Sequence, residues 1–504
     1  MNIKEAKEYI KASVSLYLKK DEFGEYRVPV VRQRPIFLLG APGIGKTAVM
    51  EQIAQELGVA LVSYSMTHHT RQSALGLPFI TQKTYGGKEY SISEYTMSEI
   101  IASIYEVMEK SGIREGILFL DEINCVSETL APSMLQFLQY KVFGRHQVPE
   151  GWVIVTAGNP PEYNKSVREF DVVTMDRLKL LEVEPDLRVW KEYARERHVH
   201  PAIVNYLDLK KDHFYCMEMT TKGRSYVTAR GWEDLSEMLY LYEEEGLSAE
   251  ETLVGQYIRN DRIVKEFTAY YDLFNKYKKD YHINDILGGC VPEQTIARAK
   301  AADFDERLSL LGMLLDRVQS DMAEVVEQAA FLSDLVTLLK ALKNQAKDGQ
   351  ADQLVMQLDK MVEGRKKLLE NLQMANSLSD LEKRRHKKVL HFLENCHKEL
   401  NAAGLAEGEE AFAHVKNRYD GLVEEMRQET GRVQGELKAL FDFAEQAFAE
   451  GNELLILVTE LTVNNESARF IASFGSPEYQ KHSRELMLSE RSMDIREQIN
   501  QLGL

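Results

Sequence analysis

The sequence has 504 residues, more than one compact core usually holds, so two or three domains are expected. Its 62 Lys and Arg against 79 Asp and Glu give a formal net charge of −17, which disfavours a surface devoted to nucleic acid or to acidic lipid. With 44% hydrophobic and 28% charged residues, the composition excludes wholesale disorder and a collagen-like repeat.

Cysteine usage and apolar runs indicate the cellular compartment in which the protein is expected. The four cysteines, Cys125, Cys216, Cys290 and Cys396, form no CxxC pair, which is typical of reduced thiols in a cytoplasmic protein. The first ten residues carry charges every few positions and predict an amphipathic helix rather than a secretory signal. The longest apolar run, residues 454–463, is shorter than the ~20 residues of a spanning helix, so no membrane insertion is predicted.

Residues 1–185 alternate short apolar segments with helical ones. The predicted strands are 35–39, 60–64, 116–120, 152–156 and 178–183. Such alternation favours an α/β fold with a doubly wound, mainly parallel sheet. Beyond residue 186 the strand pattern ends. Helical stretches at 187–197, 229–245, 249–259 and 261–277 then predict a smaller helical domain over 186–290.

The region 291–504 is predicted to be entirely helical. No proline occurs between Pro292 and Pro477, and apolar residues recur at alternating spacings of three and four from Leu308 to Leu339. Breaks rich in Gly, Asp or Asn at 347–350 and 401–404 would let the helices fold back on one another. We therefore expect antiparallel helical hairpins with coiled-coil seams.

A phosphate-binding loop follows the first predicted strand. The residues Gly40, Ala41, Pro42, Gly43, Ile44, Gly45, Lys46, Thr47 and Ala48 match the G-x-x-x-x-G-K-[ST] spacing, and an amphipathic helix follows. Backbone N–H groups of such a loop converge on a triphosphate, while Lys46 would bridge its terminal phosphates and Thr47 would ligate magnesium. The alternative is a Gly-rich turn that matches by chance.

Two further strand ends carry polar side chains. Asp121 and Glu122 follow the third predicted strand, where Asp121 could hold Mg²⁺ through water and Glu122 could orient and deprotonate an attacking water. Asn159 follows the fourth strand and could hydrogen-bond that water or the terminal phosphate. The alternatives are a solvated surface or a helix cap for the acids and a simple Asn-Pro turn for Asn159.

These three segments, in this order, resemble the AAA+ ATPases, and the MoxR branch in particular, over roughly residues 1–280. The resemblance implies ATP and Mg²⁺ as ligands and a ring, expected to be a hexamer. It implies an arginine finger at Arg177 that acts on the neighbouring subunit and a sensor arginine at Arg230 in a helical lid. Arg168 and Arg224 compete for these roles. MoxR relatives act as chaperone-like partners of von Willebrand factor A domain proteins, so a client of that kind is expected.

Two segments depart from the family pattern. The hairpin expected before the fourth strand has only residues 141–151, so it must be short. His68 and His69 lie in the place of the family's second-helix insertion. Without a third ligand at useful spacing, a pore-facing or polar loop is expected there rather than a zinc site.

The residues leave three functions open. The preferred one is an ATP-driven remodeller of a protein client. The second is a nucleic-acid motor, which the net charge disfavours, and the third is a helical scaffold gated by nucleotide with little turnover. The basic run 383–388 lies in a helical pattern, and a solvated helix face is the preferred interpretation.

Overall fold

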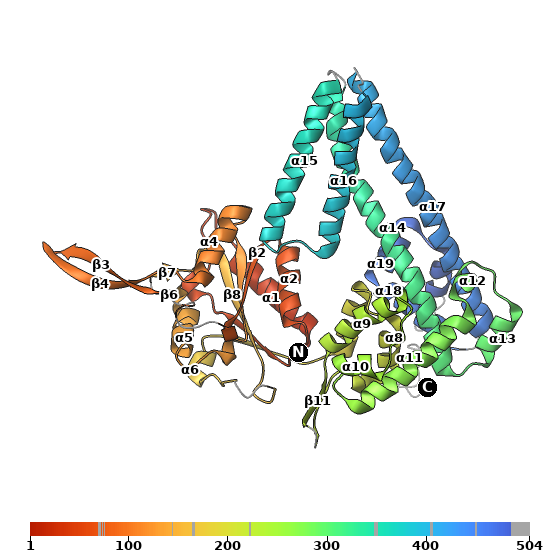
Figure 1. The fold of residues 1–504 in the computed structure, drawn as a ribbon, viewed down its shortest axis with the longest axis horizontal. Coiled ribbons are helices and arrows are strands. Elements are labelled where there is room, and N and C mark those ends of the chain that lie inside the picture. The colour runs from red at the N-terminus through yellow and green to blue at the C-terminus, as the bar shows by residue number, and fades with distance from the viewer. Residues whose placement is uncertain are drawn as a thin grey trace, which may run out of the picture. The chain divides into compact units, whose positions relative to one another are not determined.

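The computed structural model describes residues 1–484, except 69–71, 73, 75, 144, 164–166, 221–222, 347–350, 404–406 and 449–450. The chain forms two compact units (Figure 1). Unit 1 comprises Met1–Val189 and Lys360–Leu390, and unit 2 comprises Trp190–Asp359 and His391 onward. The divisions between the units fall inside three helices, α7 (Leu187–Glu196), α15 (Ala351–Met374) and α16 (Asp380–Ala403).

Unit 1 is built on a five-stranded parallel sheet in the order β2-β5-β8-β1-β9. The strands are β1 (Ile36–Gly40), β2 (Ala60–Ser65), β5 (Gly116–Asp121), β8 (Trp152–Gly158) and β9 (Lys179–Val183). All five predicted strands are therefore confirmed, as is the parallel sheet. Because parallel strands end at one edge, the residues that follow β1, β5 and β8 lie close together there.

Helices cover both faces of this sheet. They are α1 (Ile3–Tyr17), α2 (Lys46–Leu57), α4 (Glu99–Ser111), α5 (Ala131–Tyr140) and α6 (Val172–Met175), with 3-10 turns η1 (Val30–Arg32), η2 (Met66–His68) and η3 (Ile123–Cys125). Consecutive strand residues point to opposite faces, so Leu38 packs with α1 and α2 whereas Phe37 packs with α4 and α5. Burial of both faces explains the continuous apolar strands.

Two hairpins extend from unit 1. The longer pairs β3 (Pro78–Tyr85) with β4 (Lys88–Tyr95) through a two-residue turn, Gly86-Gly87, in which both residues have positive φ, 57° and 79°. The sequence did not predict this strand pair. The shorter hairpin, β6 (Val142–Phe143) with β7 (His146–Gln147), confirms that residues 141–151 form only a short one.

A buried lysine precedes the short hairpin. Lys141 ends α5 with φ 60°, is 2% exposed, and donates from Nζ to the carbonyl of Leu138 at 2.5 Å. Burial lowers the pKa of Lys141 from 10.5 to about 7.

This shift predicts a pH-dependent stability. Between about pH 7 and 10 the unfolded chain binds more protons at this site than the folded one, so stability should rise with pH; below about 7 both states are protonated and the dependence vanishes. From pH 7 to 9.5 the gain is about 3 kcal/mol. Lys141→Met should remove this increment in urea unfolding of the full chain, whereas Lys110→Met, at an exposed site on α4, should keep it. Equal pH profiles for both variants would contradict the assignment.

Unit 2 begins with a predominantly helical region. Its elements up to residue 301 are α7 (Leu187–Glu196), α8 (Pro201–Leu209), η4 (Lys211–His213), β10 (Cys216–Thr220), β11 (Gly223–Val227), α9 (Ala229–Glu244), α10 (Glu251–Tyr257), α11 (Asp261–Tyr281), α12 (Ile283–Leu287) and α13 (Glu293–Ala301). The four predicted helical stretches are confirmed. The expectation that strands end after residue 186 was wrong at β10 and β11, which form an antiparallel hairpin.

Long helices follow. They are α14 (Phe304–Ala346), α15, α16, α17 (Gly408–Phe448), α18 (Glu453–Val463) and α19 (Asn465–Phe474). Within unit 2, α14 and α17 run antiparallel, and the predicted seam is buried: Leu315, Val318 and Met322 lie in one apolar cluster with residues of α17 such as Leu440 (Figure 1). The first predicted break, 347–350, lies outside the described residues.

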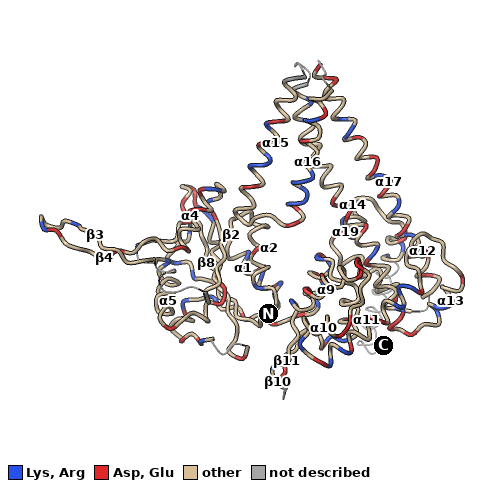
Figure 2. Tube along the Cα trace, in the orientation of Figure 1, with Lys and Arg blue, Asp and Glu red and all other residues tan. Residues whose placement is uncertain are grey.

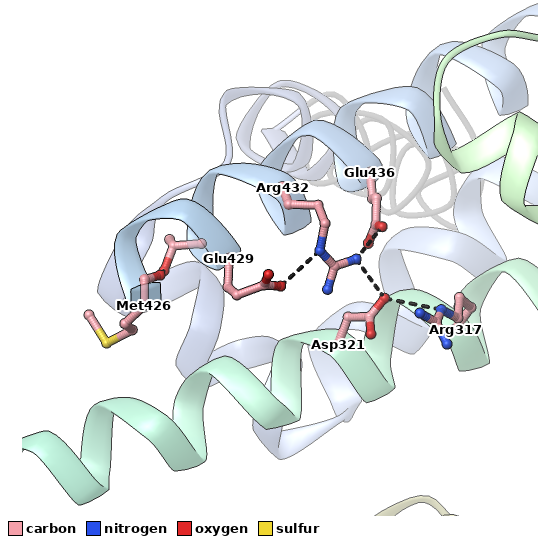
Figure 3. A network of polar contacts seen from close by, with 7 residues as sticks. Arg317, Asp321, Met426, Glu429, Arg432 and Glu436 are labelled. Carbon is pink, nitrogen blue, oxygen red and sulfur yellow. Dashed lines mark hydrogen bonds and ion pairs between the residues drawn. The ribbon is translucent and has the colours of Figure 1, made fainter. Parts of the chain in front are cut away.

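A polar network accompanies this seam (Figure 3). Asp321 of α14, 5% exposed, accepts from Arg432 of α17 at 3.3 Å and pairs with Arg317 at 3.2 Å. Arg432 also binds Glu429 at 2.8 Å and Glu436 at 2.5 Å. Burial, together with the nearby charge of Asp321, raises the pKa of Glu436. A buried carboxylate needs such partners, and the Asp321–Arg432 contact links α14 to α17 beside the apolar seam.

The basic run 383–388 lies on α16. Figure 2 colours the Lys and Arg positions along α16 blue; of these residues Arg384, Lys387 and Lys388 are exposed, and Lys383 pairs with Asp380 at 3.3 Å. Among the described residues, none of the helices is long and apolar enough to cross a membrane. All four cysteines are free thiols.

Candidate nucleotide site

The loop between β1 and α2 has a backbone that only glycines adopt readily. Gly43 and Gly45 have φ of 74° and 90°. At Gly40, a Cβ atom would lie 2.7 Å from the carbonyl oxygen of Val183 and 2.8 Å from the Ile44 side chain. These constraints explain why the loop carries three glycines.

Lys46 lies at the centre of the site. It is the first residue of α2 and is 8% exposed. Its Nζ donates to the carbonyl oxygens of Gly40 and Ala41, both at 2.8 Å, and to Oδ1 of Asn159 at 2.9 Å. The lysine therefore connects the phosphate-binding loop to the end of β8, and two of the sequence-predicted site residues are brought together.

The next helical residue faces the end of β5. The Thr47 hydroxyl donates to Oδ2 of Asp121 at 3.1 Å. Both are hard oxygen donors of the kind that Mg²⁺ prefers, and adjacent ligands of an octahedral Mg²⁺ with ~2.1 Å bonds lie roughly 3 Å apart. The predicted metal ligands thus fit one Mg²⁺ ion.

Glu122 is held in an unusual conformation beside Asp121. Its backbone has φ 54° and ψ 36°, a left-handed conformation that non-glycine residues rarely adopt and that often marks functional positions. Its Oε2 accepts hydrogen bonds from the Ser65 hydroxyl at 2.9 Å and the Thr67 hydroxyl at 3.0 Å. Ser65 is the last residue of β2 and Thr67 lies two residues later in η2, and sequence reasoning missed both.

Asn124 is a third residue to which sequence reasoning gave no role. It is 4% exposed, and its Nδ2 donates to the backbone carbonyl of Asn159 at 2.8 Å. A Cβ atom on Gly158 would lie 2.4 Å from its Oδ1, so that position requires glycine. The Asn in Asp-Glu-Ile-Asn was the available clue, and its role is to fix the turn that carries Asn159.

Cys125 follows Asn124 in η3 and is not an activated nucleophile. Burial raises the pKa of its thiol, and the nearby charges of Glu122 and Asp121 raise it further. A raised pKa keeps the thiol protonated and unreactive at neutral pH. The chemistry of this site therefore falls to its carboxylates, amide, hydroxyl and lysine.

Arg177 lies apart from this cluster. It follows α6, precedes β9 and is exposed, and its Nη1 donates to Oε1 of Gln139 on α5 at 2.6 Å. Its competitor Arg168 pairs instead with Glu128 at 2.5 Å. Hydrogen bonds from the side chain and backbone N–H of Thr174 lower the pKa of Asp171, with a smaller contribution from Arg177.

The remaining predicted residues lie elsewhere. Arg230 is an exposed residue in the first turn of α9, in unit 2, and Arg224 lies on β11. His69 and the side chain of His68 fall outside the described residues. Within the part of the chain that is described, no cluster of three or more His, Cys, Asp or Glu side chains could hold a metal ion.

Comparison with known proteins agrees with this geometry. Residues 35–178, which span the sheet from β1 to the start of β9, match the family model of the AAA domain of the dynein-related subfamily. No curated protein matches the chain. Across residues 35–178, this chain therefore carries an AAA domain of the kind found in AAA+ ATPases.

Proposed function

We propose that this chain binds ATP with Mg²⁺ at the ends of β1, β5 and β8 and hydrolyses it. The single observation that carries the proposal is the pair of contacts Lys46–Asn159 and Thr47–Asp121, which joins the phosphate-binding loop to both polar strand ends. Loop backbone N–H groups of residues 40–48 would receive the phosphates, with Lys46 adding positive charge.

Each polar side chain has a separate task in this reaction. Thr47 and Asp121 would hold the magnesium ion. When bound, Mg²⁺ supplies positive charge that stabilises the phosphoryl oxygens. Glu122 would accept a proton from the attacking water, and Asn159 would orient that water or the terminal phosphate. The hydroxyls of Ser65 and Thr67 fix the position of the Glu122 carboxylate.

Hydrolysis would be completed by a second copy of the chain. AAA+ domains commonly assemble into rings, and Arg177 is exposed on the surface of unit 1, as a residue that reaches a neighbouring subunit must be. Its guanidinium would neutralise charge that develops on the transferred phosphoryl group. A hexameric ring is the arrangement we propose.

The resemblance to the MoxR branch gives roles to the three regions that the sequence pattern predicts. Residues 1–185 would be the nucleotide-binding domain, 186–290 the lid and 291–504 the helical region. Arg230, at the start of a lid helix, would respond to nucleotide and couple its loss to lid movement. The chain would be cytoplasmic, and its client would be a protein with a von Willebrand factor A domain, remodelled in a chaperone-like way.

The proposal predicts a magnesium-dependent affinity. Thr47→Val keeps the side-chain volume but removes the hydroxyl, so Mg²⁺ should no longer strengthen ATP binding as it does in the unaltered chain, a loss of about 1–3 kcal/mol. Thr337→Val, at an exposed threonine on α14, is the matched control. Titration calorimetry with and without Mg²⁺ measures this difference, and sedimentation with ATP tests the ring. Absence of ATP binding by the unaltered chain would refute the proposed function.

A further inference from the structure

The loop between α15 and α16 covers the outer edge of the sheet in unit 1. β2 is the edge strand, and the N–H of Leu61 donates to the carbonyl oxygen of Ala375 at 3.0 Å. Ala375 is 0% exposed and belongs to the same apolar cluster as Ala60 and Val62. An uncovered edge strand presents unpaired backbone groups, and this loop satisfies one of them.

Burial, a helix cap and a left-handed residue give the α15–α16 loop a defined conformation at this contact. Ser377 and Leu378 are 8% and 7% exposed. Ser379 and Glu382 form a reciprocal cap at the start of α16: the Glu382 N–H donates to the Ser379 hydroxyl at 3.2 Å, and the Ser379 N–H donates to Glu382 Oε2 at 2.9 Å. Asn376 adopts a left-handed conformation, φ 49°, which asparagine tolerates better than most residues.

The same strand reaches the candidate site at its other end. Leu61 and Ser65 are four residues apart on β2, about 13 Å along a strand. Ser65 is the last residue of β2, and its hydroxyl holds the Glu122 carboxylate. β5 and β8 separate β2 from β1, which carries the phosphate-binding loop. A shift of β2 would therefore move the support of Glu122 without moving Lys46 or Thr47.

We infer that the α15–α16 loop is a positioning element for hydrolysis: its contact with β2 sets the place from which Ser65 holds Glu122. The inference rests on the proposed role of Glu122. The loop joins α15, which begins at residue 351, to α16, which ends at residue 403, so a movement of these helices would be transmitted through the loop to β2 and change the rate of hydrolysis. The affinity for ATP, which depends on Lys46 and Thr47, would stay the same.

The test places a charge in the buried contact. Ala375→Asp should displace the loop, and Gln373→Asp, two residues earlier and exposed, is the matched control. In the full chain, amide hydrogen exchange at Leu61 should become at least tenfold faster in Ala375→Asp, kcat for ATP should fall at least fivefold, and the ATP dissociation constant should stay within twofold. Gln373→Asp should change none of these.

Two further variants test the loop contact and the support of Glu122 separately. Should Ala375→Asp fail to fold, Asn376→Val strains the left-handed position of the loop without burying a charge, and the same three measurements apply. Ser65→Ala should reproduce the fall in kcat while leaving exchange at Leu61 unchanged. Faster exchange with unchanged kcat overturns the inference, as does unchanged exchange in both loop variants. Failure of the unaltered chain to hydrolyse ATP would instead overturn the proposed function.

Discussion

Glu122→Gln is expected to bind ATP normally and to lose hydrolysis, whereas Lys46→Ala is expected to lose binding. Gln keeps the size and hydrogen-bonding reach of Glu122 but cannot take a proton, so the rate should fall by about 10²–10⁴. Lys46 supplies the only side-chain cation in the phosphate-binding loop of residues 40–48, and its removal also breaks the contact with Asn159. Charge attraction and water activation are therefore separable.

Fluorescent-nucleotide binding and phosphate release measure the two effects. Glu109→Gln and Lys110→Ala, neighbours on the exposed face of α4, are the matched controls and should behave as the unaltered chain. Equal loss of binding in both site variants would argue against these roles.

The hydrolysis-blocked Glu122→Gln form, with ATP bound, should also retain its client, and recovery of a von Willebrand factor A protein would support the proposed MoxR branch. Stimulation of turnover by DNA would favour a nucleic-acid motor instead.

The second large effect concerns the interface between subunits. Arg177→Ala should lower turnover by about 10³–10⁵ while preserving ATP binding, because the finger contributes only as charge develops during transfer. Mixed with Glu122→Gln, it should regain part of the activity. Some interfaces in the mixed ring combine an intact Glu122 from one subunit with an intact Arg177 from the next.

Turnover measured across mixing ratios gives the result. The same titration with Arg168→Ala is the comparison, since Arg168 is already paired with Glu128. Rescue with Arg168→Ala but not with Arg177→Ala would assign the finger to Arg168. If no ratio restores activity while the ring remains intact, Arg177 does not act across the interface.

Much of unit 1 could be predicted because its information is local. The three central strands β1, β5 and β8 are largely apolar and buried, and the loop of residues 40–48 must carry glycine where φ is positive or a Cβ would clash. The hairpin of β10 and β11 could not be predicted in the same way. Its exposed positions, such as Met219 at 80%, do not alternate between a buried and a solvated face, so no period-two pattern marks it.

The amino-acid sequence alone determined the phosphate-binding loop, the acidic and amide strand ends, and the heptad seam of α14, because each depends on neighbours within a few residues. Only the tertiary structure decided that Ser65 and Thr67 hold Glu122 and that Ala375 covers β2 at Leu61. Those partners are 55 to 314 residues apart, and a contact made across such a distance leaves no spacing in the chain from which it could be recognised.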